Sequence, residues 1–259
     1  MRLSPRDFDA LQGAILELYD YRDAAAFREA TPKIFLRMIP AEDFIMVDAD
    51  VDVAARTMRA TDVWETSPRI KGDAIARMER AGWNHPFTQH AMKTGNLGAL
   101  KFSDFFSMRE FRSSELYDEF YRHVSVERLL GAMMLHGPTS VSTINTIRRS
   151  SEKDFSERDR LMLNLLRPHF DLARRNAERV TARRAERAES LESYRLTPRQ
   201  QQVAEWLAKG KTNLEISLIL DMRVRTVEKH VENILGKLSV ENRTAAAVMI
   251  AASNEVGEE

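Results

Sequence analysis

The stretch TPRQQQVAEWLAKGKTNLEISLILDMRVRTVEKHVENILGKL, residues 197–238, carries the start and stop signals of consecutive short helices. In a capping box, a Thr and a Gln or Glu three residues later each bond the other's backbone N–H group. The stretch holds two such pairs, Thr197 with Gln200 and Thr212 with Glu215. Gly210 stands where a helix is expected to end on a left-handed residue. These signals predict one helix that begins at residue 198 and a second that begins at residue 213.

A third helix is predicted at the end of this stretch, in RTVEKHVENILGKL, residues 225–238. Helical spacing places one apolar stripe on it, made of Val227, Val231, Ile234, Leu235 and Leu238. The segment TAAAVMIAAS predicts a fourth helix after the turn SVENR, and the four helices form a compact all-helical domain. The short turn DMRV between the second and third helices favours a helix-turn-helix, whose second helix can enter a major groove about 12 Å wide. A protein-docking bundle and a structural cap are the alternatives.

Residues 196–246 closely resemble the helix-turn-helix of LuxR-type regulators. The chain has the family's leading L-T-x-R, its G-x-[ST]-N-x-E-I core, the T-V-x-x-H of its recognition helix and the closing N-I-x-x-K-L-x-V-x-N-R. Two positions depart from the pattern. Gln200 replaces the usual Glu and can still close a capping box, whereas Arg223 replaces a capping Ser and cannot cap in the same way. Either Asp221 substitutes for that Ser, or the first turn of the third helix is looser.

The resemblance implies that the second helix crosses the DNA backbone and that the third lies in the major groove. Glu228, Lys229 and Glu232 are then the base-reading candidates, because Lys can donate to guanine and Glu can accept from cytosine. Neither Glu has an obvious partner of opposite charge on the same helix, whereas His230 is interpreted as structural. The candidates for phosphate contact are Thr212, Asn213, Arg223, Arg225, Thr226, Lys237 and Arg243.

The composition limits the other possibilities. The chain has 259 residues and no net charge, since 39 Lys and Arg balance 39 Asp and Glu, so any basic surface must be local. The absence of Cys excludes disulfides, thiolate nucleophiles and cysteine-ligated zinc. The N-terminus lacks an apolar signal core, and the longest apolar run, AAAVMIAA at 245–252, is too short to span a bilayer. A cytoplasmic protein with no membrane partner is predicted.

The part of the chain before residue 171 mixes helix and strand signals. A first helix begins with Ser4 as N-cap and Pro5, and a second is predicted over 23–38 with an interruption at Pro32. Further helices are predicted over 72–81, 86–94 and 109–122, and after Ser156. The strands are DFIMVDADV, RTMRATDV, LLGAMMLHG and SVSTINTIRR, the last two forming an antiparallel pair. This order predicts an α+β sensor-type domain, a sheet with flanking helices, rather than a doubly wound fold.

A polar helix connects the two parts. DLARRNAERVTARRAERAESLESY, residues 171–194, has no Gly or Pro and few large apolar residues. A short heptad-like seam precedes its most polar part, made of Leu166, Phe170, Ala173, Ala177 and Val180. Both a solvated linker and a dimerisation helix fit this pattern. The predicted organisation is a sensor and dimerisation domain at 1–170, a helical connector at 171–194 and a DNA-binding domain at 195–259.

The segments at 85–124 and 154–178 resemble the GAF-like sensor domain of many bacterial LuxR-type regulators. The resemblance implies a small-molecule or protein signal. A phosphorylated receiver does not fit, because Asp7 and Asp9 lie in a helical pattern with no strand before them. NHPFTQHAM and LKFSDF are similar to segments of acyl-homoserine-lactone receptors. That reading is less favoured, because His85 stands where the ligand-binding Asp would be and Phe102 replaces a Trp.

The candidates for a ligand pocket are aromatic residues and one histidine, although core packing is the default role of aromatic side chains. They are Phe44, Trp64, Trp83, His85, Phe87, Tyr117 and Tyr121. The six histidines are scattered, and His85 and His90 are poorly spaced for joint metal binding on one helix. No catalytic or nucleotide-binding motif is present, so no metal, cofactor or enzymatic activity is expected.

The sequence as a whole predicts a transcription regulator that binds specific DNA sequences and is controlled by a signal at its N-terminal domain. The expected partners are double-stranded DNA, a second copy of the chain, a small-molecule effector and RNA polymerase. A homodimer is expected because one domain of this kind buries little surface on DNA. The alternative is a ligand-free dimeric regulator whose N-terminal domain only docks partners.

Overall fold

A computed structural model of the chain describes residues 3–67, 73–148, 153–193 and 196–255. It separates into two compact units, Met1–Glu178 and Arg179–Glu259. Tyr194 and Arg195, where the connector was predicted to end, lie outside the described residues. The first unit contains helices α1 (Pro5–Asp20), α2 (Ala24–Met38), α3 (Asp73–Gly82), α4 (Pro86–Thr94) and α5 (Met108–Arg112) and the short turns η1 (Phe102–Asp104) and η2 (Tyr117–Tyr121). It also contains α6 (Glu157–Ser193) as far as Glu178.

One antiparallel sheet organises the first unit. Its strands are β1 (Asp43–Asp52), β2 (Thr57–Glu65), β3 (Leu100–Lys101), β4 (Arg128–Leu135) and β5 (Ser140–Arg148), in the order β2-β1-β5-β4-β3. Every neighbouring pair is antiparallel, and the predicted pairing of β4 with β5 is confirmed. Strand β1 pairs with the central strand β5, so that Phe44 lies opposite Thr146. Residues about a hundred positions apart in the sequence are therefore hydrogen-bonded neighbours in the middle of the sheet.

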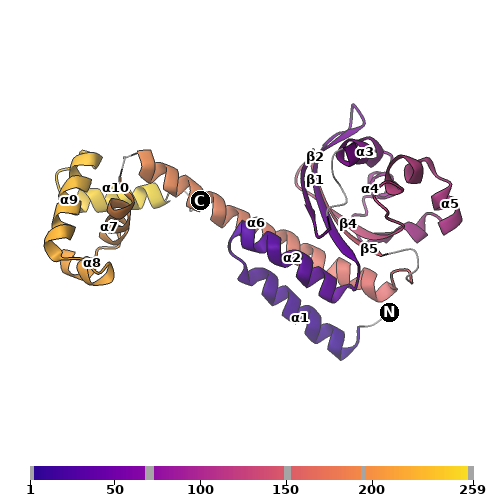
Figure 1. Cartoon of the computed structure of the whole chain (residues 1–259), viewed down its shortest axis with the longest axis horizontal. Helices are drawn as coiled ribbons and strands as arrows, with labels where there is room; N and C mark the ends of the chain where they lie inside the picture. The colour runs from indigo at the N-terminus through magenta and orange to yellow at the C-terminus, as the bar shows by residue number, and fades with distance from the viewer. Residues whose placement is uncertain (1–2, 68–72, 149–152, 194–195, 256–259) are drawn as a thin grey trace. The chain divides into compact units, whose positions relative to one another are not determined.

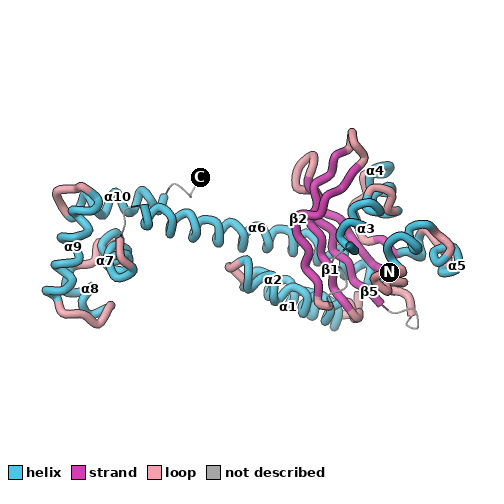
Figure 2. Tube along the Cα trace, turned by 45° about the horizontal axis from the view of Figure 1, so that its top comes forward, coloured by secondary structure: helices cyan, strands magenta, loops and turns pink. Residues whose placement is uncertain are grey.

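Helices cover both faces of this sheet, as Figures 1 and 2 show. Successive residues of a strand point to opposite faces. Phe44 and Met46 of β1 accordingly join the core formed with α1, α2 and α6. Ile45, Val47 and Ala49 join a second core, formed with α3, α4, α5 and η2. Two separate hydrophobic cores thus share one sheet, and the α+β class predicted for this part of the chain is confirmed.

The heptad-like seam of α6 belongs to the first of these cores. Leu166, Phe170, Ala173 and Ala177 are at most 2% exposed and pack beneath α2 and the sheet. They are consequently covered within their own chain. The expectation that this part of the helix is a solvated linker or a free dimerisation seam is wrong for these four residues, because the sheet already occupies their apolar stripe.

Two other local predictions are wrong. Pro32 does not interrupt α2, which runs through it. The helix predicted over 109–122 is broken into α5 and the π-helical turn η2. At the break, Ser113 Oγ donates to the Arg109 carbonyl and Ser114 Oγ to the Phe111 carbonyl. These serine side chains compete with the backbone N–H groups for helical acceptors, which is how Ser weakens a helix interior.

The second unit is entirely helical in its described residues, as predicted. Its helices are α7 (Pro198–Ala208), α8 (Asn213–Ile219), α9 (Val224–Leu238) and α10 (Arg243–Glu255), together with the last part of α6. They enclose a small core around Val203, Leu207, Ile216 and Ile234, each of which is fully buried. In α8, Ile216 is buried whereas Leu214 and Ile219 are exposed.

Candidate functional site

The capping boxes predicted for the second unit are present. Thr197 Oγ accepts from the Gln200 N–H group and Gln200 Oε1 accepts from the Thr197 N–H group, at 3.3 and 2.9 Å. The Gln therefore closes the box as expected. Thr212 and Glu215 form the second box, and the hydrogen bonds with Thr212 hold the pKa of the Glu215 carboxyl below its ordinary value. Gly210 is left-handed, with φ of 75°.

Arg243 fixes the start of α8. Its Nη1 donates to Asn213 Oδ1 at 2.8 Å, and its Nη2 donates to the Lys211 carbonyl. Two residues predicted to contact phosphate, Asn213 and Arg243, are thus bonded to one another. Lys237, a third phosphate candidate, donates from Nζ to Gln200 Oε1 at 2.7 Å. These contacts give Arg243 and Lys237 a role in holding the helices of the domain together.

The turn between α8 and α9 is held by backbone geometry and by one arginine. Asp221 adopts a left-handed conformation, with φ of 51°, and the Met222 N–H group donates to the Ser217 carbonyl. Arg199 of α7 donates to the Leu220 carbonyl at 2.7 Å, a contact that the sequence analysis missed. Arg223 is the N-cap of α9 and makes no side-chain capping hydrogen bond. Of the two expectations for this departure, the looser first turn fits the described contacts.

Helix α9 has one buried and one exposed face. Val227, Val231, Ile234 and Leu238 are buried, and Leu235 is partly buried. On the other side, six of the predicted DNA-contacting residues are exposed over the first turns of the helix and its N-cap: Arg223, Arg225, Thr226, Glu228, Lys229 and Glu232. Within the described part of the chain, neither Glu228, Lys229 nor Glu232 has an ion-pair partner. Their charged groups are consequently available to an external partner.

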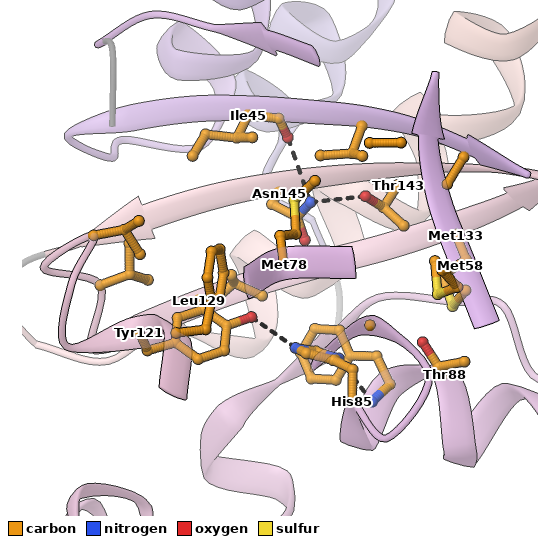
Figure 3. A pocket seen from close by; sticks show the side chains of 18 of the residues that line it. Ile45, Met58, Met78, His85, Thr88, Tyr121, Leu129, Met133, Thr143 and Asn145 are labelled. Carbon is orange, nitrogen blue, oxygen red and sulfur yellow. Dashed lines mark hydrogen bonds between the residues drawn. The ribbon is translucent and has the colours of Figure 1, made fainter. Parts of the chain in front are cut away.

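A cavity lies in the first unit, against the face of the sheet that α6 does not cover (Figure 3). It has a volume of about 110 Å³ and is lined from β1, β2, β4, β5, α3, α4 and η2. Three of the seven predicted pocket residues line it, namely His85, Phe87 and Tyr121. Phe44 and Trp64 lie in the core on the opposite face of the sheet, and Trp83 and Tyr117 do not line the cavity. Strand alternation places Phe44 and Trp64 on the other face of the sheet, so the prediction of these two as residues of this cavity is wrong.

A buried histidine and a tyrosine form the main polar contact of the cavity. His85 caps α4, and its Nδ1 accepts from the Phe87 N–H group at 3.2 Å. Its Nε2 lies 2.7 Å from the Tyr121 hydroxyl oxygen. Burial lowers the pKa of His85 to about 4 and raises the pKa of the Tyr121 hydroxyl. Both groups are therefore uncharged at neutral pH.

The sequence analysis missed two polar residues of the cavity. Thr143 and Asn145 of β5 face it together with Ile147, and Asn145 Nδ2 donates to Thr143 Oγ1 at 3.1 Å (Figure 3). Strand alternation could have found them, because residues at every second position of SVSTINTIR share one face.

On the opposite face of the same strands, a partly buried charge pair ties β1 to α6. Arg174 Nη1 and Nη2 donate to the two oxygens of Asp48 at 2.8 and 2.6 Å, and Arg174 Nε donates to Glu178. Ser142 Oγ also donates to Asp48, and the Arg174 guanidinium lies 4.9 Å from the Trp64 ring centroid. The two partners are 126 positions apart, so their pairing was invisible in the sequence.

Two negative findings concern the described residues alone. Among residues 3–67, 73–148, 153–193 and 196–255, no three His, Asp or Glu side chains gather as a metal site. No helix within those ranges combines the length and the apolar character needed to cross a membrane.

Comparison with known proteins gives a family match within the second unit. Residues 194–250 match the model of the luxR family of bacterial regulatory proteins. A putative HTH-type transcriptional regulator of Sinorhizobium fredii is 30% identical over 114 residues, which are 44% of this chain and 33% of that protein. The transcriptional activator protein ExpR of Pectobacterium parmentieri is 28% identical over 144 residues, 55% of each protein. The chain thus spans between a third and about half of the length of these relatives. Among solved structures, SdiA in complex with octanoyl-rac-glycerol is 15% identical with a TM-score of 0.49, over 100% of this chain and 99% of that one.

Proposed function

Because residues 194–250 carry a domain of the LuxR family of bacterial regulatory proteins, we propose that the chain is a transcription regulator that binds specific DNA sequences. The proposal includes a small-molecule signal, bound in the cavity of the first unit. The matched family consists of regulators rather than enzymes, so no catalytic step is part of the proposal. Such a regulator would act in the cytoplasm, where it meets DNA and RNA polymerase.

The observation that carries the proposal is the exposed face at the start of α9. Glu228, Lys229 and Glu232 present an acceptor, a donor and a second acceptor, and none of them forms an ion pair with a residue that the structure describes. In a major groove, Lys can donate to guanine O6 and N7, and Glu can accept from cytosine N4. A carboxylate facing DNA is repelled by phosphate unless it makes such a bond. The two glutamates are therefore assigned to reading bases.

Phosphate contact is assigned to the residues that flank this face. Arg223, Arg225 and Thr226 are exposed at the N-terminal end of α9, where backbone N–H groups also favour an anion. Thr212 and Asn213 are assigned the same role from the start of α8. Arg243 would act by holding Asn213 in place, and Lys237 by tying α9 to α7 through Gln200.

Strands β1 and β5 are proposed to couple ligand binding in the cavity to the position of α6. In β1, Val47 and Ala49 line the cavity, while Asp48 between them faces α6 and holds Arg174. In β5, Thr143 lines the cavity, while its neighbour Ser142 bonds Asp48. A ligand that shifts either strand therefore acts on the residues that anchor α6. We assign the functional form to a homodimer, in which α6 transmits this shift to the spacing of two DNA-binding domains.

Selection from random DNA with the purified full chain tests the proposal. We expect an enriched two-part site and binding that weakens as salt is raised. On that site, Glu228→Ala should change the preference among single-base variants by about 1–3 kcal/mol. Arg225→Ala should instead weaken binding on all sequences alike and reduce the salt slope by about 1.

Glu241→Ala supplies the matched control, because Glu241 is an exposed carboxylate in the turn after α9. It should leave both affinity and sequence preference unchanged. The DNA-binding role is rejected if no sequence is enriched at low salt. The assignment of base reading is rejected if Glu228→Ala and Arg225→Ala have the same effect on every sequence.

A further inference from the structure

We propose that an arginine stripe on the connector helix α6 is a further DNA contact, which binds phosphates of the backbone beside the bases that α9 reads. The stripe consists of Arg179, Arg183 and Arg184. The inference rests on the DNA-binding function proposed above and adds a contact surface to it. It is carried by three features of α6: the pairing of its arginines, the local excess of positive charge and the lack of apolar side chains beside the stripe.

The arginines of α6 differ in their partners along the helix. Arg174 and Arg175 are bonded to carboxylates of the first unit, Arg174 to Asp48 at 2.6 Å and Arg175 to Asp171 at 2.7 Å. One turn later this pairing stops. The three side chains of the stripe are exposed, and none of them forms an ion pair with a residue that the structure describes. Their guanidinium groups are consequently available to an external anion.

The stripe lies in the most basic stretch of α6. Residues 179–187 hold four arginines and one carboxylate, Glu186, which leaves a local excess of three positive charges. The chain as a whole has no net charge. Arg179 and Arg183 are four residues apart, and like charges at this spacing on a helix repel one another. An anionic partner would remove this repulsion.

Helix packing does not account for the stripe. Residues 181–190 contain no apolar side chain larger than that of Ala, and Ala182 and Ala185 are exposed. The apolar seam of the helix ends at Val180, which is partly buried. A coiled coil needs large apolar residues in each heptad, at the a and d positions. The surface around the stripe therefore fits a polar, anionic partner better than a second helix.

The spacing of the stripe fits the phosphates of a DNA strand. Arginine is always charged, and its N–H donors form a planar fork that matches a phosphate group. Arg179 and Arg183 are separated by about 6 Å along the helix axis. Successive phosphates of one strand are about 3.4 Å apart along the duplex axis, so that alternate phosphates are about 7 Å apart. Two arginines of the stripe can therefore each bind a phosphate of the same strand.

The stripe is also near the DNA-binding helices along the chain. Arg179 is the first residue of the second unit, to which α7, α8 and α9 belong. From Arg184 to Ser193, helix α6 advances by about 14 Å. The five residues from 194 to 198 can add at most about 18 Å. The sum, about 32 Å, is less than one helical turn of DNA, so phosphates next to each half-site are within reach of the stripe.

A triple variant of the full chain tests the stripe, with Arg179→Gln, Arg183→Gln and Arg184→Gln combined. Gln has nearly the helix propensity of Arg, so the variant should keep the circular dichroism of the wild type. On the site selected with the wild type, binding should be at least about tenfold weaker at 0.15 M salt. The salt slope should fall by about 2–3 for each bound chain, with the preference among single-base variants unchanged. An unchanged salt slope overturns the proposal.

Two control variants separate contact from charge. Replacing the same three arginines by Lys keeps the charge and should recover most of the lost affinity and slope. Arg37→Gln, Arg59→Gln and Arg122→Gln together remove three charges from exposed ion pairs of the first unit. This second control should change the slope by less than about 1, because salt screens exposed charges beyond about 8 Å. An equal loss in the second control assigns the effect to net charge and overturns the stripe.

Ethylation of single phosphates locates the contact on the DNA. Some phosphates outside the selected bases should block binding of the wild type when they are ethylated. The same modifications should have no effect on binding of the triple Gln variant. If every phosphate matters equally to both proteins, the stripe does not touch the backbone.

A duplex of random sequence makes this proposal and the proposed function fail separately. Non-specific binding depends on phosphate contacts alone, so the stripe is tested on this duplex even if no sequence is enriched. Weaker binding of the triple Gln variant to it, without any enriched site, keeps the stripe and rejects the sequence-specific regulator. An enriched site that wild type and variant bind equally keeps the regulator and rejects the stripe.

Discussion

The two units of the chain reach their structures by different routes. In the second unit, each of the first two helices begins at a capping box closed over three positions, Thr197 with Gln200 and Thr212 with Glu215. In the first unit, the central pair of strands joins Asp43 to Ile147 and Phe44 to Thr146. Local signals therefore specify the second unit, whereas distant pairings specify the first.

The polar anchors of the two units differ in the same way. Arg243 reaches Asn213 and Lys237 reaches Gln200 across about thirty to forty positions, and these contacts are partly exposed. Asp48 and Arg174 are separated by 126 positions, and their side chains are only 14% and 13% exposed. We expect stability in the first unit to depend far more on single distant partners than stability in the second.

The largest predicted effect is that of Asp48→Ala. The substitution removes the main partner of the Arg174 guanidinium and should lower the free energy of unfolding of the first unit by about 3–5 kcal/mol. Urea unfolding followed by the fluorescence of Trp64 and Trp83 measures it, with Trp206 reporting on the second unit. Asp50→Ala breaks the exposed pair with Arg59 and should cost less than about 1 kcal/mol. Equal losses for the two variants would remove the contrast between buried and exposed anchors.

A smaller effect is expected from pH. The pKa of His85 is lowered from 6.5 to about 4 by burial, so above pH 7 the imidazole is neutral in both folded and unfolded chains. As the pH falls below 6.5, the unfolded chain takes up a proton that the folded chain does not. The free energy of unfolding should therefore decrease down to about pH 4, by at most about 3 kcal/mol from this group.

His85→Asn tests this dependence, because Asn can still accept at the N-cap of α4 but does not titrate. The variant should flatten the profile of unfolding free energy between pH 7 and 4. His123→Gln replaces an exposed histidine and should keep the wild-type profile. A profile that His85→Asn leaves unchanged would assign the pH dependence to other groups.

The smallest effect is expected in the second unit. Arg223 has the extended backbone of an N-cap, with φ of −72° and ψ of 140°, but no capping hydrogen bond. Arg223→Ser should stabilise this unit by about 1 kcal/mol, measured by unfolding followed through Trp206. Arg225→Ser, inside the helix, should not stabilise it. If DNA affinity falls while stability rises, Arg223 is a phosphate contact. The N-cap position of α9 would then carry a residue that favours DNA binding over helix stability.

Local sequence patterns predict the second unit better than the first for physical reasons. Capping, glycine and apolar spacing act within a few residues, and they correctly predicted α7, α8 and α9. The same reasoning failed for the helix over 109–122, where Ser113 and Ser114 bond nearby carbonyls. It also failed for the seam of α6, because a stripe of apolar residues does not reveal whether a sheet of the same chain or a second chain covers it.

The predicted site residues show the same difference between the two units. Six of the ten predicted DNA contacts lie together at the start of α9, because residues near in sequence on one helix stay near in space. Three of the seven predicted pocket residues line the cavity, since the face on which Phe44 or His85 lies depends on how the sheet is assembled. Thr143 and Asn145 line the cavity because alternate residues of β5 face it, which their residue types alone do not indicate.

Sequence alone was enough to predict the helices of the second unit, its resemblance to a family of bacterial regulatory proteins and the chemical character of the face that α9 exposes. The folded structure was needed to show that Arg243 and Lys237 connect the helices of the second unit, that the α6 stripe belongs to a core and that His85, Tyr121 and Asn145 line one cavity. The reason is the range of the interactions. Hydrogen bonds at helix ends join neighbours along the chain, whereas a cavity and a buried ion pair exist only after strands about a hundred positions apart have paired.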